Sequence, residues 1–160
     1  MSTSSPSSEA AGASAGRRYS FTGTYQVKLA GGRARLVLPS VWREQFGGPV
    51  KVGPCPLREG VRVYPPDEFD RIVDQLYAAQ LDNQVWARQL SSWLARHYYE
   101  VTPDTAGRIE LPSGVSGSFT WPSKDEVVLT GGHRYVLILA EVADPAPVYI
   151  GLPDYLPAYI

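Results

Sequence analysis

The amino-acid sequence predicts an α+β fold that is rich in β-strands, built from two copies of one β-rich unit with a pair of helices between them. Three observations carry this prediction: short segments that alternate between apolar and polar residues, a motif that occurs twice, and two amphipathic stretches in mid-chain. The chain has 160 residues, of which 44% are hydrophobic and 19% are charged. This composition is globular, and the length suffices to bury a core.

The first copy of the unit begins near Tyr19. Its expected elements are strands at 24–29 and 35–38 that form a hairpin around the turn 30–34, a helix at 40–46, and strands at 49–53 and 60–65. Ser40 is expected to cap the helix at its N-terminus, and Gly47 and Gly48 are expected to end it.

Two amphipathic segments follow. Apolar residues recur at helical spacing after Asp67 and again after Asp82, so each aspartate is expected to cap one helix of a helical hairpin. The residues expected on the apolar faces are Phe69, Ile72, Val73, Leu76 and Tyr77 in the first helix, and Val85, Trp86, Leu90, Trp93 and Leu94 in the second.

The strand pattern then begins again, with expected strands at 98–102, 108–111, 126–130 and 134–142. In both copies a glycine-containing turn leads into Arg-x-x-Leu-Pro, with Arg35 four residues before Pro39 and Arg108 four residues before Pro112. Neither copy of such a repeat has to bury its apolar face alone. We therefore expect the two copies to pack on each other as a pseudo-two-fold unit.

The predicted organisation has five parts: a disordered tail at 1–18, the first repeat at 19–66, the helical hairpin at 67–98, the second repeat at 99–142, and a C-terminal arm at 143–160. The arm is rich in proline and tyrosine, and its prolines exclude a regular helix. Its many apolar residues predict that it docks as an extended segment, either on a neighbouring subunit or on the chain's own helical hairpin.

Charge is distributed unevenly along the chain. Residues 17–45 hold six arginines and lysines against one glutamate, whereas residues 46–160 hold nine against fourteen acidic residues. A basic segment on an acidic body indicates an anionic partner. Lys28, Arg33 and Arg35 lie on one predicted hairpin and are the expected nucleic-acid contacts, because arginine binds phosphate and the guanine edge well. Arg108 is the corresponding residue of the second hairpin, where Asp104 is expected to form an ion pair with it across the turn.

Several classes of function are not indicated. Cys55 is the only cysteine, which suits a reducing, cytoplasmic setting, and no apolar run is long enough to span a membrane. His97 and His133 have no partner at metal-ligand spacing, and no nucleophile–base or phosphate-loop motif is present. We therefore expect neither an enzyme nor a small-molecule substrate, metal or other cofactor.

The segments "FTGTYQVKLAGGRARLVLPSVWREQF", "VRVYPPDEFDRI" and "VTPDTAGRIELP" resemble the MraZ family of bacterial transcription regulators, which are double swapped-hairpin proteins of the SpoVT/AbrB class. The resemblance covers about residues 19–142. It implies two SpoVT/AbrB-like swapped-hairpin repeats and sequence-specific binding to double-stranded promoter DNA of a division and cell-wall gene cluster. It also implies a homo-oligomeric ring whose hairpins face the DNA, in the cytoplasm and on the nucleoid.

The family signature is Asp-x-x-Gly-Arg near each hairpin turn. The second repeat has it as Asp104, Gly107 and Arg108; the first keeps Arg35 but has Gly31 and Ala34 at the other two places. Two further functions remain open here. One is a structural or assembly protein that keeps the ring-forming fold without operator recognition. The other is an antitoxin of the same hairpin class, which would bind a toxin through its C-terminal segment.

Overall fold

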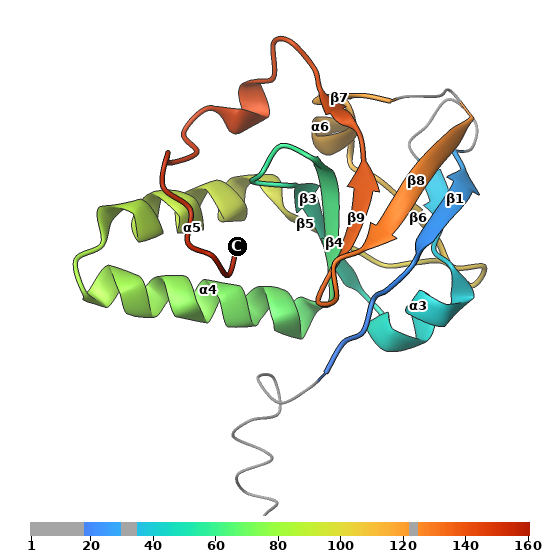
Figure 1. The fold of residues 1–160 in the computed structure, drawn as a ribbon, viewed down its shortest axis with the longest axis horizontal. Helices are drawn as coiled ribbons and strands as arrows, with labels where there is room; N and C mark the ends of the chain where they lie inside the picture. The colour runs from blue at the N-terminus through green and yellow to red at the C-terminus, as the bar shows by residue number, and fades with distance from the viewer. Residues whose placement is uncertain (1–17, 30–34, 122–124) are drawn as a thin grey trace, which may run out of the picture.

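The structure is a computed structural model, and it describes residues 18–29, 35–121 and 125–160. The architecture is α+β (Figure 1), with a six-stranded sheet, two two-stranded ribbons, and a helical hairpin beside the sheet. This confirms the α+β class with a sheet-rich core. The expected disordered tail at 1–18 lies outside the described residues, except for Arg18.

The six-stranded sheet runs in the order β1-β8-β9-β4-β3-β5 and is antiparallel throughout. Its strands are β1 (Thr24–Lys28), β3 (Val50–Pro54), β4 (Gly60–Tyr64), β5 (Tyr99–Val101), β8 (Glu126–Gly131) and β9 (Val136–Leu139). β1 from the first half pairs with β8 from the second, and β5 from the second half pairs with β3 from the first. Each outer strand is therefore held by the opposite half of the chain.

The two ribbons are β2 (Arg35–Val37) with β6 (Arg108–Glu110), and β7 (Phe119–Thr120) with β10 (Glu141–Val142). The two strands of the first predicted hairpin thus take their ladder partners from the second half, β8 for β1 and β6 for β2. The predicted turn at 30–34 lies outside the described residues. The strand expected at 134–142 is divided, because β9 stays in the main sheet while β10 leaves it to pair with β7.

The helices are α3 (Ser40–Phe46), α4 (Pro66–Leu81), α5 (Val85–His97), the short α6 (Ser113–Ser116) and the 3-10 turn η1 (Pro147–Tyr149). The predicted N-caps were wrong: Asp67 lies inside α4, whose N-cap is Pro65, and the N-cap of α5 is Gln84. Ser40 is the first residue of α3, whose N-cap is Pro39, and Asp82 is the C-cap of α4. Proline fixes φ and is extended here, with ψ 139° at Pro39, so the helix begins at the next residue. Gly47 ends α3 with φ 69°, as glycine at this position often does.

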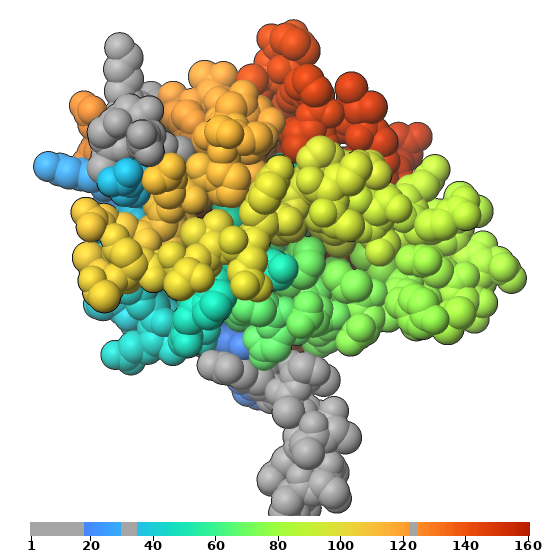
Figure 2. Space-filling view, turned by 180° about the vertical axis from the view of Figure 1, so that it is seen from behind, coloured from blue at the N-terminus to red at the C-terminus, as the bar shows by residue number. Residues whose placement is uncertain are grey.

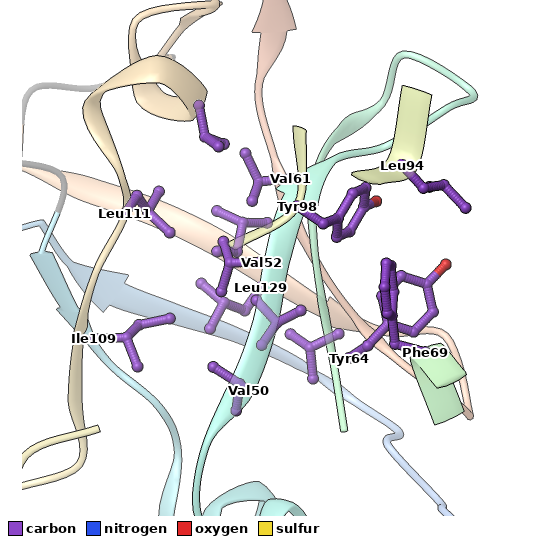
Figure 3. Packing of buried hydrophobic residues seen from close by; sticks show 14 of the residues in the cluster. Val50, Val52, Val61, Tyr64, Phe69, Leu94, Tyr98, Ile109, Leu111 and Leu129 are labelled. Atoms are coloured by element: carbon purple, nitrogen blue, oxygen red, sulfur yellow. The ribbon is translucent and has the colours of Figure 1, made fainter. Parts of the chain in front are cut away.

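The core joins both halves of the chain. Figure 3 shows Val50 and Val52 of β3 beside Leu129 of β8, with Ile109 and Leu111 on the neighbouring segment. All five are buried, and burying each such side chain contributes roughly 1.5–3 kcal/mol. Two residues expected on the apolar helix faces are instead exposed, Tyr77 and Val85.

The C-terminal segment lies against the helical hairpin of its own chain, as Figures 1 and 2 show from opposite sides. Trp93 of α5 donates from Nε1 to the Val148 carbonyl oxygen at 2.7 Å. Tyr149 stacks on the Trp93 ring and donates its hydroxyl to the Cys55 carbonyl oxygen at 2.7 Å. At the end of the segment, the Arg62 guanidinium donates to the Ile160 carbonyl oxygen. Of the two docking places that the sequence left open, the structure shows the chain's own helices.

Candidate nucleic-acid interface

The β2–β6 ribbon brings the repeated arginines together at the end of the molecule away from the helical hairpin (Figure 1). Its inward side chains are Leu36 and Ile109, each 1% exposed. Because side chains alternate along a strand, the residues on either side of them face outward. The outward face carries Arg35, Val37, Arg108 and Glu110. The sequence repeat thus becomes one exposed surface with an arginine from each half.

Arg108 is held by the turn that precedes it. Asp104 Oδ1 accepts hydrogen bonds from the backbone N–H groups of Ala106 and Arg108, both at 2.9 Å. Asp104 Oδ2 accepts from Arg108 Nε at 2.7 Å. The pKa of the Asp104 carboxyl is lowered below its ordinary value. The largest cause is the hydrogen bond from the Arg108 backbone N–H, and the second is the hydrogen bond from the Arg108 side chain. The carboxylate is therefore charged at neutral pH. It holds the turn through the backbone N–H groups and holds the Arg108 side chain at Nε.

Arg43 of α3 lies across the same turn, although it comes from the other half of the chain. Its Nη1 donates to the Ala106 carbonyl oxygen at 2.9 Å. Gly107 is buried with φ 79°, and a Cβ placed there would lie 2.2 Å from Arg43 Cδ. Glycine is therefore favoured at position 107 for two reasons, its left-handed backbone and the space that Arg43 fills.

Replacing Gly107 by alanine is expected to lower the free energy of unfolding by roughly 2 kcal/mol, about half from the left-handed backbone and the rest from displacing Arg43. Gly47→Ala is the matched control, because Gly47 has φ 69° and a Cβ there would meet only the Glu44 carbonyl oxygen, at 4.0 Å. In an Arg43→Ala background, Gly107→Ala and Gly47→Ala should lower the free energy of unfolding by the same amount. Equal costs in the wild-type background would contradict the proposed clash with Arg43. Urea unfolding measures all four differences.

Arg35 has a carboxylate partner that the sequence did not reveal. Its Nη2 lies 3.3 Å from Oε1 of Glu110, the residue directly opposite it in the ladder. Both side chains are partly solvent-accessible, at 38% for Arg35 and 51% for Glu110. The first copy has Gly31 where the second has Asp104, but the pairing of β2 with β6 supplies Arg35 with a carboxylate from 75 residues away.

The other predicted contacts are placed differently. Lys28 is exposed at the end of β1, in the six-stranded sheet and opposite Glu126 in the register, and β1 contacts β2. Arg33 lies outside the described residues. Sequence reasoning missed Arg43 and Glu110. A signal for Glu110 existed, because Arg-Leu-Val-Leu-Pro in the first copy becomes Arg-Ile-Glu-Leu-Pro in the second.

The described part of the chain contains no group of three or more His, Cys, Asp or Glu side chains that could hold a metal ion. Among the same residues, no helix has both the length and the apolar character needed to cross a membrane. His97 belongs to α5 beside Trp93, and His133 exchanges backbone hydrogen bonds with Phe21.

No family model matches the chain. A curated relative, described as the transcriptional regulator MraZ of Salinispora arenicola (strain CNS-205), is 32% identical over 123 residues. The matched stretch covers 77% of this chain and 83% of the relative.

Proposed function

Because the chain belongs to the MraZ family of transcriptional regulators, we propose that it binds double-stranded promoter DNA through the β2–β6 ribbon. One observation carries the proposal: Arg35 and Arg108, one from each half of the chain, share the outward face of a two-stranded antiparallel ribbon. A two-stranded ribbon fits the major groove, and arginine can bind both phosphate and the guanine edge.

The proposal includes a pair of swapped-hairpin repeats of the SpoVT/AbrB class. The strand order supports it, since exchanging the equivalent strands of the two halves (β1 with β5, β8 with β3, β9 with β4) reproduces the same sheet. The ribbon supports it too, because equivalent strands β2 and β6 pair with each other. In such a pair of repeats, the strands of each half take their ladder partners from the other half.

We propose further that the protein acts in the cytoplasm, on the nucleoid, at the promoter of a division and cell-wall gene cluster. There it would form a homo-oligomeric ring that presents several ribbons to repeated DNA boxes. Linking several weak contacts in this way raises the overall affinity without any new contact. The regulator is proposed to act without a cofactor or catalysis.

A structural or assembly role is the second candidate, and the Arg35–Glu110 pair favours it. A guanidinium already paired with a carboxylate attracts phosphate less than a free one. Under this alternative the ring-forming fold is retained and operator recognition is lost.

Replacing Arg35 or Arg108 by alanine tests the proposal. Each is expected to weaken binding to promoter DNA by about 2 kcal/mol if it contacts a base edge, and the double variant more than either. A variant that loses only a phosphate contact should weaken binding to all sequences alike and reduce the salt dependence of log Kobs by about 0.9. Fluorescence anisotropy on short duplexes measures both quantities.

Arg88→Ala is the matched control, because Arg88 is exposed on α5 in the helical hairpin. It should leave DNA affinity unchanged. Binding by the double variant equal to that of the wild type would remove the ribbon from the DNA interface. Absence of DNA binding by the wild type itself would favour the structural role.

A further inference from the structure

We propose that Glu110 is a specificity-determining residue of the β2–β6 ribbon, holding the Arg35 guanidinium in place and opposing binding to DNA by phosphate contacts alone. The inference rests on the proposed function, since it concerns what the same surface recognises. It assigns a role to the carboxylate on the outward face of the ribbon, whose other residues are Arg35, Val37 and Arg108.

The geometry places Glu110 where it must influence any DNA at the ribbon. It lies directly opposite Arg35, with 3.3 Å between its Oε1 and Arg35 Nη2, and it shares the outward face of the ribbon with Arg108. Both side chains are partly exposed, and neither is part of the core, so a ligand can reach them from solvent. Phosphate that approaches Arg35 also approaches the Glu110 carboxylate.

In the internal repeat, the position that corresponds to Glu110 carries no charge. Val37 stands at the position of the first copy that corresponds to Glu110, and it lies opposite Arg108 by the same register. The Val37–Arg108 pair therefore forms no ion pair across the two strands. Arg108 instead forms its ion pair with Asp104, in the turn that precedes it. The two equivalent positions of one ribbon therefore differ in charge.

The two carboxylates are also held differently. Asp104 accepts two backbone N–H bonds in addition to the bond from Arg108. The Arg35–Glu110 bond is longer, at 3.3 Å, against 2.7 Å for Arg108–Asp104. Asp104 is thus part of the turn, whereas Glu110 reaches across the ribbon to a guanidinium of the opposite strand.

The chemistry of the pair favours a base edge over the phosphate backbone. A phosphate can replace Glu110 as the partner of Arg35, but the displaced carboxylate then faces a like charge. A G·C pair in the major groove satisfies both side chains, since guanine presents two acceptors to arginine and cytosine presents an amino donor to glutamate. The expected ligand is therefore duplex DNA with G·C pairs at the position that Arg35 and Glu110 reach.

The test compares Glu110→Gln and Glu110→Val with the wild type. The glutamine keeps the shape of the side chain, and the valine restores the residue of the first copy. Asp74→Asn is the matched control, because it removes one negative charge from an exposed position on α4. Duplexes are first enriched by the wild-type protein from a randomised pool, and Kd is then measured for the enriched duplex and for a shuffled duplex of equal composition.

Both Glu110 variants are expected to bind the shuffled duplex more tightly, and the ratio of shuffled to enriched Kd should fall about tenfold, the discrimination typical of one base contact. Freeing one more cation for phosphate should make the loss of shuffled-DNA affinity between about 50 and about 200 mM salt roughly threefold larger. The midpoint of urea unfolding should shift only slightly, because an exposed ion pair contributes little to stability. The Asp74 variant should behave as the wild type in every measurement.

Three results would count against the inference, and they are distinguishable. An unchanged Kd ratio in both Glu110 variants, with a wild type that prefers the enriched duplex, would overturn the role of Glu110 and leave the proposed function intact. The same fall of the Kd ratio in the Asp74 variant would mean that the effect comes from the net charge of the protein and not from Glu110. Failure of the wild type to bind either duplex, or to enrich any sequence, would overturn the proposed function and the inference with it.

Discussion

Replacing Trp93 by alanine is expected to lower the free energy of unfolding by about 3–5 kcal/mol. The side chain is fully buried, and its Nε1 donates to the Val148 carbonyl oxygen at 2.7 Å. Its ring stacks on Tyr149 with 5.8 Å between the ring centroids. The substitution leaves a large cavity and a buried carbonyl without its donor, and the two costs add. Urea unfolding with an unchanged m-value would measure the loss.

Trp86→Ala provides the control on the same helix. Trp86 is half-buried and meets Tyr155 edge-on, with the ring centroids 4.9 Å apart, so its removal should cost clearly less. A double-mutant cycle between Trp93→Ala and Tyr149→Ala should show coupling, because the two rings are in contact. Additive losses would mean that the C-terminal segment does not lie on α5 in solution.

Replacing Glu68 by alanine is expected to cost about 3 kcal/mol. The Glu68 side chain is 1% exposed and contacts two guanidinium groups, Arg71 at 2.5 Å and Arg134 at 3.2 Å. Removing one member of a buried ion pair leaves its partners uncompensated, at a typical cost of about 3–5 kcal/mol. The lower end applies here because Arg71 is 22% and Arg134 46% exposed, so water can partly hydrate both cations. The measurement is again the free energy of unfolding in urea.

Asp70→Ala is the control for charge, since Asp70 is exposed on the same turn of α4. It should change stability by less than about 0.5 kcal/mol. Arg134→Ala should cost much less in the Glu68→Ala background than in the wild type. Equal costs in both backgrounds would show that Glu68 does not join α4 to the segment between β8 and β9.

The local elements could largely be predicted from the sequence, because their signals are local. Apolar residues at helical spacing, such as Leu76 and Leu90, predicted the two helices, and both residues are fully buried. The same periodicity erred at Tyr77 and Val85, which are exposed. Periodicity states which residues share a helix face, but not how far along the helix that face is covered.

The candidate site could be predicted only in part. The repeated motif identified Arg35 and Arg108 as equivalent residues, and Asp104 as a residue four positions before Arg108. These relations lie within a few residues or follow from comparing the two copies. Nothing local indicated that Glu110 faces Arg35, or that Arg43 fills the space beside the second turn.

The sequence by itself determined where most of the strands and the helices α3, α4 and α5 form, and which residues the two halves have in common. Only the tertiary structure decided which strand pairs with which: β1 pairs with β8, and β2 with β6. It also decided that the C-terminal segment lies on Trp93. The physical reason is that alternation specifies the buried face of a strand, while its hydrogen-bond partner comes from anywhere in the chain. For Arg35 that partner is 75 residues away, and the charge of the proposed DNA surface depends on it.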